Sequence, residues 1–485
     1  MTAPGDTPSS TLSATLTDPL HAALVAAIGA ANVLTEADGD LSPYVLDWRK
    51  RHLGRARLVV RPGSTAEVAA VVRACVAHRV ALVPQGGNTG LVGGSVPDAS
   101  GTQVLLSLTR MNRLRGVDTA NLTLTVEAGA ILQNVQLMAA ENGLLFPLSL
   151  AAEGSCTIGG NLATNAGGTQ VLRYGNAREL CLGLEVVTAT GEVWNGLSGL
   201  RKDNTGYDLR DLYIGSEGTL GVITAATLKL FPQPAARCTA LAALASLDAA
   251  VGLLQLAQER LGSSLTGFEV MSAYALDLVR SHLPQLVQPL PRAVWTVLLE
   301  QSDSESETHA RALFEALLET ALERGLIDDA AVAVSTAQSH AMWQLREAIP
   351  TAQSLEGPNI KHDIALPVSV IPRFVAATDA ALLAAFPGVR LVNFGHLGDG
   401  NLHYNVQAPL GVDANGFLRD CELAVNTVVY DAVDACGGSI SAEHGIGLLK
   451  RDELAQRKSP VALALMRTIK LALDPQNLMN PGRVL

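Results

Sequence analysis

Three glycine-rich clusters in the first half of the chain constrain its fold more than any other feature. They occupy residues 84–94 (PQGGNTGLVGG), 154–168 (GSCTIGGNLATNAGG) and 215–221 (GSEGTLG), each beside an apolar segment. Glycine lets the backbone adopt positive φ and approach a ligand closely, and successive N–H groups then form an anion-binding nest. A tight surface turn explains one such cluster equally well, but three in one region favour a site for a dinucleotide pyrophosphate.

The spacing of these glycines argues against two common nucleotide sites. None of the clusters has the GxGxxG pattern of a Rossmann site or the GxxxxGKS/T pattern of a P-loop. Short apolar strands are predicted around them at 104–108, 122–127, 184–188 and 222–230, with helices of 3.6-residue periodicity between strands. This alternation predicts an α+β fold with a mixed sheet.

The chain is long enough for more than one domain. At about 150 residues per domain, 485 residues suggest two large domains or three smaller ones. Residues 231–234 (FPQP) are the best linker candidate, because two prolines in four residues break regular structure. A second α+β region follows, with helices predicted near 248–261 and 306–323.

Charge and cysteine content narrow the class of protein. A net charge of −11 argues against non-specific binding to nucleic acid, whose phosphates need a basic surface, but a small anionic substrate can still occupy a local basic pocket. Six widely spaced cysteines without a CxxC pair indicate a reducing compartment and no disulfide framework. The first twenty residues contain no Lys or Arg, which argues against a secretory or transit leader. We therefore expect a cytoplasmic protein.

No membrane-spanning helix is expected. The nearest approach is residues 239–257, where Asp248 at the centre would cost about 2.5–3.5 kcal/mol in lipid. The stretch is better explained as a short strand followed by a helix that Ser246 caps.

A hairpin signal brings two histidines together in the second half of the chain. Asp399-Gly400 is a strong two-residue turn, and with it His396 and His403 are predicted to be directly opposed on neighbouring strands. Opposed Cβ atoms lie about 4.5–5.5 Å apart, which suits two imidazoles on one metal ion. Glu443 is the candidate third ligand, and this donor set suits catalytic Zn²⁺, Fe²⁺ or Mn²⁺. From periodicity alone, histidines that only hydrogen-bond within a sheet are the simpler interpretation.

The glycine-rich clusters resemble those of a known flavoprotein superfamily. PQGGNTGLVGGSVPD, GSCTIGGNLATNAGG and GSEGTLGVIT are similar to the FAD-binding domain of the vanillyl-alcohol oxidase/PCMH superfamily, in particular its D-lactate, glycolate and D-2-hydroxyglutarate dehydrogenase branch. The resemblance covers nearly the whole chain and implies a PCMH-type FAD-binding domain, a second α+β cap domain and a C-terminal segment that returns to the flavin domain. The implied parts are an N-terminal tail and helical segment (1–55), the FAD-binding domain (56–233), the cap (234–435) and the C-terminal segment (436–485).

The resemblance also implies which residues hold the cofactor. FAD is expected to be non-covalent, because no histidine lies between 79 and 281, and Cys156 is better explained as a small packed residue. Residues 84–90 are expected around the pyrophosphate. The full set expected to contact FAD is Pro84, Gln85, Gly86, Gly87, Asn88, Thr89, Gly90, Ser155, Cys156, Thr157, Gly159, Gly160, Asn161, Thr164, Asn165, Gly167, Gly168, Glu217, Gly218, Gly221, Ile223, Asn401 and Asn480.

For the histidines, the resemblance favours a metal site. In this branch the positions that match His396, His403 and Glu443 bind a divalent metal, usually zinc, and the position that matches His444 is the base. Oxidation of an alcohol carbon releases a hydride, which flavin accepts, and a proton. A histidine with a pKa of about 7 is suited to take that proton.

An anionic substrate needs cations to hold it. Arg346 and Lys361 lie in segments that match the substrate-contacting stretch of the family, and Asn405 is a weaker candidate. Without the resemblance, the two cations would be taken for ordinary surface charges. One departure is Pro350, four residues after Arg346, where the 2-hydroxyglutarate enzymes tend to carry a hydroxyl residue. This departure counts against the longer dicarboxylate.

The resemblance therefore implies FAD-dependent oxidation of a small D-2-hydroxy acid to the 2-oxo acid, with a divalent metal as Lewis acid. Electrons would pass to a quinone, a cytochrome or an electron-transfer flavoprotein. One alternative is a transferase like alkylglycerone-phosphate synthase, which lacks this metal set. The other is a non-catalytic flavin-binding subunit of a glycolate oxidase-type complex. A homodimer and a peripheral membrane contact are compatible with the sequence.

Overall fold

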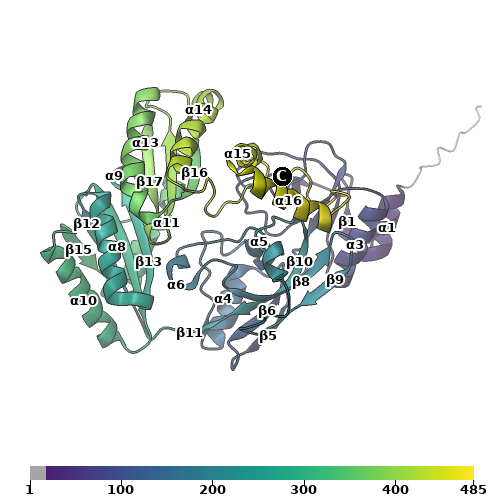
Figure 1. The fold of residues 1–485 in the computed structure, drawn as a ribbon, viewed down its shortest axis with the longest axis horizontal. Coiled ribbons are helices and arrows are strands. Elements are labelled where there is room, and N and C mark those ends of the chain that lie inside the picture. The colour runs from purple at the N-terminus through teal and green to yellow at the C-terminus, as the bar shows by residue number, and fades with distance from the viewer. Residues whose placement is uncertain (1–17) are drawn as a thin grey trace, which may run out of the picture.

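A computed structural model describes residues 18–485, which form two lobes side by side (Figure 1). One hydrophobic core uses residues from Leu20 to Leu230 together with Met479, and another uses residues from Ala240 to Ile440. The predicted N-terminal tail falls mainly in residues 1–17, outside the described residues, and a helical segment follows as α1 (Pro19–Ile28). The predicted α+β class is confirmed.

The first lobe contains two main sheets. The four-stranded sheet has the order β1-β2-β4-β3, with β2, β4 and β3 parallel: Val33–Leu34, Ala56–Val60, Gln103–Ser107 and Leu82–Gln85. The five-stranded antiparallel sheet has the order β5-β6-β10-β8-β9: Leu114–Asp118, Thr123–Glu127, Gly221–Lys229, Cys181–Thr188 and Val193–Gly196. Four of these strands agree with the predicted strands to within a few residues.

Helix α3 (Thr65–Ala77) illustrates how the sequence forms the first lobe. The Ser64 hydroxyl caps its first turn by accepting a hydrogen bond from the Glu67 N–H. Apolar side chains three and four residues apart, such as Val68, Val71 and Val72, are buried in the core. Between α1 and β10, the other α-helices of this lobe are α2 (Ser42–Val45), α4 (Leu132–Glu141), α5 (Ile158–Ala163), α6 (Val171–Tyr174) and α7 (Arg210–Tyr213).

The second lobe is built on one seven-stranded antiparallel sheet of order β15-β12-β14-β13-β17-β18-β16. Its strands are Asp329–Val332, Ala236–Leu244, Trp295–Asp303, Leu265–Ser272, Arg390–His396, Asn401–Gln407 and Asn359–Ala365. Strands of period two place alternate side chains on opposite faces. The sheet therefore presents two faces, which are covered differently.

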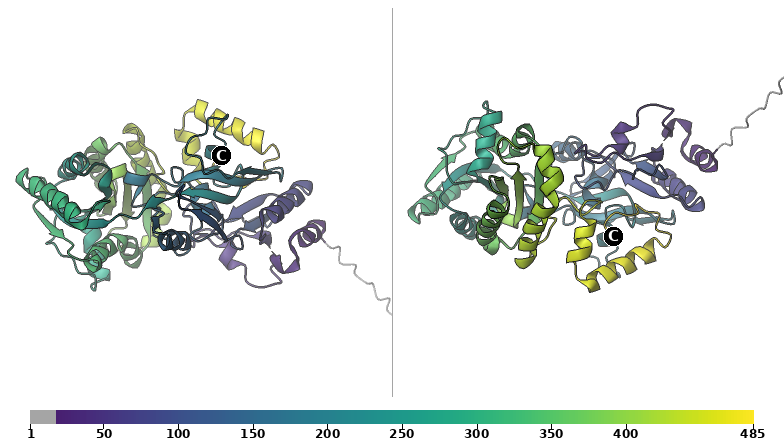
Figure 2. Two further views of the ribbon diagram at one scale, coloured as in Figure 1. Left: turned by 90° about the horizontal axis from the view of Figure 1, so that it is seen from below. Right: turned by 90° about the horizontal axis from the view of Figure 1, so that it is seen from above.

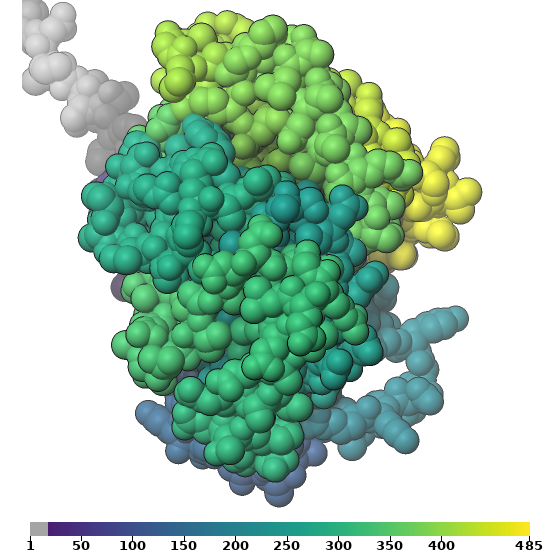
Figure 3. Space-filling model, turned by 90° about the vertical axis from the view of Figure 1, so that its left-hand side faces the viewer, coloured from purple at the N-terminus to yellow at the C-terminus, as the bar shows by residue number. Residues whose placement is uncertain are grey.

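One face of this sheet is covered by long helices and the other only in part. The first face packs against α8 (Leu247–Leu261), α10 (Glu307–Glu323), α13 (Ile371–Ala385) and α14 (Ala414–Ala435). The second face packs against α9 (Ala273–His282), α11 (Thr336–Glu347) and α12 (Ile349–Glu356). In the view from the left-hand side of Figure 1, the second lobe lies in front and hides most of the first lobe (Figure 3).

The chain crosses between the lobes twice. The predicted linker begins with β11 (Phe231–Pro232), which pairs with β7 (Leu144–Leu145) before the chain enters β12. After α14 the chain returns, and α15 (Arg451–Arg457) and α16 (Pro460–Leu473) lie on the outside of the first lobe (Figure 2). The Asn480 N–H then donates to the Leu82 carbonyl, beside β3. The predicted return of the C-terminal segment is confirmed.

One helical stretch, Val368–Ala385, is long and apolar enough to cross a membrane. Its buried side chains, among them Ile371, Phe374 and Leu382, belong to the core of the second lobe. Residues 239–257, considered above, form most of β12 and most of α8, and the Ser246 hydroxyl accepts the Ala249 N–H as predicted.

Candidate functional site

The glycine-rich clusters meet around one cavity in the first lobe. The loop after β3, the start of α5 and the start of β10 enclose about 910 Å³ of space between atoms. Sixteen of the expected FAD residues line it: Pro84, Gln85, Gly86, Gly87, Asn88, Thr89, Gly90, Thr157, Gly159, Gly160, Asn161, Thr164, Glu217, Gly218, Gly221 and Ile223. His444 of the C-terminal segment also lines this cavity.

Close backbone packing explains two of the glycines. A Cβ at Gly87 would lie 2.0 Å from the Ser155 carbonyl oxygen, and a Cβ at Gly86 would lie 2.3 Å from Thr157 Oγ1. Asn88 adopts positive φ (53°), and its side-chain amide donates to the Leu46 carbonyl at 2.9 Å. The first glycine loop therefore lies directly against the second.

The cavity has the properties that a dinucleotide needs. Its wall is rich in glycine, whose bare backbone lets N–H groups approach an anion closely. Thr157 Oγ1 is buried without a hydrogen-bond partner among residues 18–485, so a polar ligand atom can pair with it. The residues present therefore fit the expected FAD.

Seven expected FAD residues lie outside the cavity wall: Ser155, Cys156, Asn165, Gly167, Gly168, Asn401 and Asn480. Asn401 is buried in the second lobe, where its amide donates to Asp363 and Ile364. Asn480 instead supports the wall, because its amide donates to the carbonyls of Gly94 and Glu217. The wall also includes seven residues outside the expected FAD set, of which all but Leu108 lie within the glycine-rich motifs: Val92, Gly94, Ser95, Leu108, Ala163, Ser216 and Val222.

The predicted hairpin register is wrong by two residues. His403 on β18 lies opposite Phe394 on β17, not opposite His396. The reason is the turn, since residues Leu397–Asp399 form a short 3₁₀ helix and lengthen the connection beyond two residues. A shift of two residues keeps each side chain on its predicted face. The two imidazoles still approach, with ring centroids 5.5 Å apart.

His396, His403 and Glu443 form a cluster with the donor set of a metal site. One ligand atom from each lies within 4.8 Å of the others. His396 Nε2 is 3.6 Å from Glu443 Oε1. Two imidazole nitrogens and one carboxylate oxygen suit a tetrahedral zinc ion with one open position. These residues therefore fit the expected divalent metal.

Glu269 on β13 joins the cluster to Arg346 and lies outside the sequence motifs. Its fully buried carboxylate contacts His396 Nδ1 at 2.6 Å and accepts a hydrogen bond from Arg346 Nε at 2.7 Å. Burial opposes ionisation, but His396 and Arg346 lower the pKa of Glu269 to about 2. Burial likewise opposes protonation of His396, but Glu269 raises the pKa of His396 to about 9. A charged residue inside the apolar strand LTGFEVMS was the signal that could have identified Glu269.

Asp363 on β16 organises the opposite side of the cluster and was not singled out from the sequence either. Its buried carboxylate lies 3.7 Å from His403 Nδ1 and 3.7 Å from His444 Nδ1. Burial opposes ionisation of Asp363, but His444, Lys450 and His403 hold its pKa well below the usual range. Strand alternation from Lys361 was the available signal, because residues two apart share a face.

His444 stands between the cavity and the cluster. It lines the cavity, and its ring centroid is 6.4 Å from that of His403. Burial lowers the pKa of His444 to about 4, and Lys450 and Lys361 add to the effect while Asp363 opposes it. Its imidazole is therefore neutral near pH 7 and can accept a proton, but burial places its pKa below the value of about 7 expected for the base.

Three cations, Arg346, Lys361 and Arg49, lie on the side of the second lobe that carries the histidine cluster. Arg346 uses Nε for Glu269, which leaves its terminal nitrogens for another anion. Lys361 lies on the face that carries Asp363, and burial and the nearby Arg49 lower the pKa of Lys361 to about 8. Arg49 belongs to the first lobe and was not singled out from the sequence. Neither Lys361 nor Arg49 has an ion-pair partner among the described residues.

Asn405 shares that face but is engaged within the protein. Its amide nitrogen donates to Gln353 Oε1 at 3.0 Å, and its oxygen accepts the His362 N–H at 3.2 Å. It lies opposite Lys361 on the neighbouring strand. Asn405 therefore helps to fix β18 in place beside Lys361.

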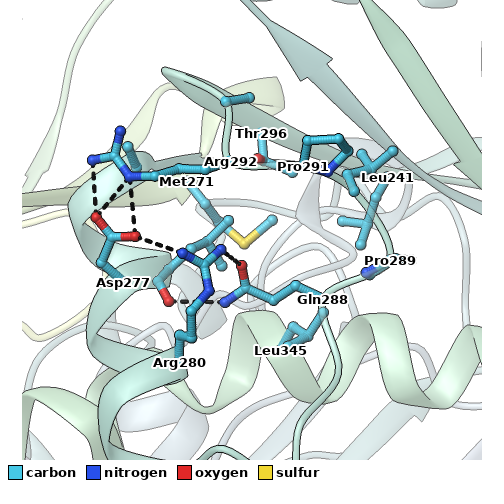
Figure 4. Close-up of a pocket in the computed structure, with 14 residues that line it drawn as sticks. Leu241, Met271, Asp277, Arg280, Gln288, Pro289, Pro291, Arg292, Thr296 and Leu345 are labelled. Atoms are coloured by element: carbon cyan, nitrogen blue, oxygen red, sulfur yellow. Dashed lines mark hydrogen bonds and ion pairs between the residues drawn. The ribbon is translucent and has the colours of Figure 1, made fainter.

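A second hollow of about 390 Å³ lies at the surface of the second lobe, between α9 and the loop that follows it (Figure 4). Asp277 neutralises both of its cations, since it pairs with Arg280 at 3.1 Å and with Arg292 at 2.9 Å. None of its lining residues belongs to the histidine cluster or to the glycine-lined cavity. This hollow offers no unpaired charge to a substrate anion.

Two family models match the chain. "FAD binding domain" matches residues 56–196, and "FAD linked oxidases, C-terminal domain" matches residues 233–484. The first match contains two of the glycine-rich clusters, and the second contains the histidine cluster.

Curated relatives match along nearly the whole chain. A D-2-hydroxyglutarate dehydrogenase of Xanthomonas citri pv. viticola is 42% identical over 471 residues, which is 97% of each chain. The mitochondrial D-2-hydroxyglutarate dehydrogenase of Arabidopsis thaliana is 39% identical over 462 residues, covering 94% of this chain and 80% of the relative.

Solved structures share the fold at much lower identity. A p-cresol methylhydroxylase with substrate bound has a TM-score of 0.75 at 18% identity and covers 96% of both chains. An alkyldihydroxyacetonephosphate synthase has a TM-score of 0.72 at 16% identity, covering 95% of this chain and 84% of that one. At these identities the likeness establishes the fold alone.

Proposed function

This chain belongs to the FAD-linked oxidase family and, within it, to the FAD-dependent D-2-hydroxy-acid dehydrogenases, and on that basis we propose that its substrate is D-2-hydroxyglutarate. The product would be 2-oxoglutarate. The observation that carries the proposal is the position of His444, which borders the glycine-lined cavity and directly follows Glu443 of the histidine cluster.

In the proposed reaction, bound FAD supplies the hydride acceptor, and a divalent metal held by His396, His403 and Glu443 supplies a Lewis acid. The His444 imidazole, neutral near pH 7, accepts the proton of the C2 hydroxyl. Asp363, close to His444 Nδ1, stabilises the positive charge that His444 then carries. Glu269 keeps His396 oriented with Nε2 toward Glu443.

The number of cations supports a substrate with two carboxylates. The Arg346 guanidinium lies over the Phe394 ring, with its Cζ atom 4.8 Å from the ring centroid. The two terminal nitrogens of Arg346 suit one substrate carboxylate. Lys361 and Arg49 supply further positive charge from the two lobes. The hydroxyl residue that relatives carry at the position of Pro350 is not replaced nearby, because Pro350 lies in the first turn of α12 and Thr351 is exposed. We therefore assign the second carboxylate to the Lys361 and Arg49 side of the site.

The alternative functions have less support. A transferase like the synthase above would not use this combination of two histidines, a carboxylate and a neutral base. A non-catalytic subunit would have no need for a buried Glu269–His396 pair. The electron acceptor is proposed to be a quinone, a cytochrome or an electron-transfer flavoprotein.

The test is anaerobic reduction of the bound flavin. D-2-Hydroxyglutarate should bleach the flavin absorbance of metal-loaded protein faster than D-lactate, glycolate or D-malate, and L-2-hydroxyglutarate should not bleach it. Faster bleaching by D-lactate would overturn the dicarboxylate assignment. No bleaching by any D-2-hydroxy acid would overturn the proposed activity.

A further inference from the structure

The loop that carries His444 is held by one buried carboxylate from each lobe. We propose that Glu217 and Asp363 set the position of the His444 imidazole, so that the base is in place only when both lobes are docked. The inference rests on the role of His444 proposed above. Residues 443–447 are called the base loop from here on.

Asp363 holds the beginning of the base loop. Its Oδ2 accepts hydrogen bonds of 2.8 Å from the N–H groups of Glu443 and His444. Its Oδ1 accepts a hydrogen bond of 2.9 Å from the Asn401 amide. Both oxygens are therefore occupied, and the side chain is fully buried in the second lobe.

Glu217 holds the end of the base loop from the first lobe. Its Oε1 accepts the Ile446 N–H at 2.7 Å, and its Oε2 accepts the Gly447 N–H at 2.8 Å. Glu217 was expected to contact FAD and does lie on the cavity wall, but both carboxylate oxygens bond the base loop. Its backbone adopts positive φ (52°), in the turn that precedes β10 (Gly221–Lys229).

The glycines of the base loop fit this arrangement. Gly445 and Gly447 have φ of +81° and +52°, which glycine adopts without strain. A Cβ at Gly445 would lie 2.8 Å from Glu217 Oε1, and a Cβ at Gly447 would lie 2.4 Å from the Val92 carbonyl oxygen. The spacing in EHGIG is thus explained by the close approach of the first lobe.

Lys450 closes the same segment. Its Nζ is buried and donates to the Ile440 carbonyl at 2.7 Å, which joins the two ends of the segment around the base loop. Its charge interacts favourably with both Asp363 and Glu217. Hydrogen bonds from N–H groups to carboxylates are among the stronger ones in proteins. A displacement of the base by about 1 Å can lower a rate on the order of 100-fold.

The test is Glu217→Gln, because the amide nitrogen of Gln cannot accept an N–H and one of the two bonds is lost. The matched control is Glu185→Gln, since Glu185 is also buried in the first lobe but accepts hydrogen bonds from Thr65, Thr224 and Arg115, all of the first lobe. Glu217→Gln should speed hydrogen–deuterium exchange of the base loop and should slow flavin reduction at saturating substrate about tenfold or more. FAD content, and the affinity for the product 2-oxo acid, should stay at wild-type values. The control should change none of these quantities.

Unchanged exchange in the base loop of Glu217→Gln would overturn the inference, and so would faster exchange with an unchanged rate of flavin reduction. Loss of FAD with normal exchange would assign Glu217 to cofactor binding instead. Asp363→Asn should speed exchange at the same loop from the other lobe. Exchange is measured without substrate, so a failure of this inference can be told apart from a failure of the proposed dehydrogenase activity.

Discussion

At the residue scale, Glu269 shows how a buried charge is accommodated beside a functional group. Its carboxylate contacts both His396 and Arg346, and it is fully buried. An isolated carboxylate would be very costly in this environment, so it is stable only with both cationic partners. The same contact fixes which nitrogen of His396 faces Glu443.

We predict that, above pH about 9, where His396 is deprotonated in both proteins, Glu269→Gln lowers the affinity for divalent metal about 10–100-fold, as is typical for loss of the partner of a metal-ligating histidine. In the wild type, Glu269 raises the pKa of His396 to about 9, and burial raises the pKa of Glu443 to about 7. Metal must displace both protons, so its affinity should rise with pH through about 7 and about 9. In Glu269→Gln the pKa of His396 should fall, so the part of the rise that reflects His396 should move to lower pH. Zinc titration monitored by calorimetry measures both effects, and a pH-independent affinity in the wild type would contradict the metal assignment.

At the element scale, the glycine loops depend on contacts between their backbones. Gly87 and Gly154 belong to neighbouring glycine-rich clusters but differ in surroundings: a Cβ at Gly87 would lie 2.0 Å from a backbone oxygen, whereas a Cβ at the exposed Gly154, outside the cavity wall, would meet only Gln133 Oε1 at 3.6 Å. Gly87→Ala should therefore abolish FAD retention, and Gly154→Ala should keep it. Flavin absorbance per polypeptide after gel filtration measures the difference. Full flavin content in Gly87→Ala would show that the loops separate at little cost.

The same scale shows which elements the sequence predicts. The helices predicted at 248–261 and 306–323 are confirmed as α8 and α10, because their apolar periodicity and serine caps agree. The hairpin at Asp399-Gly400 is present, but its register is not the predicted one. A local turn signal cannot account for the 3₁₀ helix before it, which packs against the rest of the lobe.

At the scale of the whole molecule, the site depends on how the two lobes meet. Arg173 of α6 donates to the Ser302 carbonyl of β14 at 2.8 Å across the boundary. Arg173→Ala should lower the free energy of unfolding by about 1 kcal/mol, the usual net worth of such a bond. Arg467→Ala on the exposed surface of α16 is the matched control and should change it by less than about 0.5 kcal/mol. Urea denaturation followed by flavin fluorescence measures both, and equal stabilities would show that this contact does not couple the lobes.

The sequence by itself determined the α+β class and the glycine-rich loops from local causes, namely backbone freedom at glycine and the spacing of apolar residues. The metal roles of His396, His403 and Glu443 and the base role of His444 were predicted from the family resemblance, because strand alternation alone favoured histidines that only hydrogen-bond within a sheet. Only the tertiary structure decided that Glu269, Asp363 and Arg49 belong beside them, and that Asn401 lies away from the cavity. Those assignments depend on pairing between strands and lobes far apart in the chain, and spacing along one sequence carries no information about such pairing.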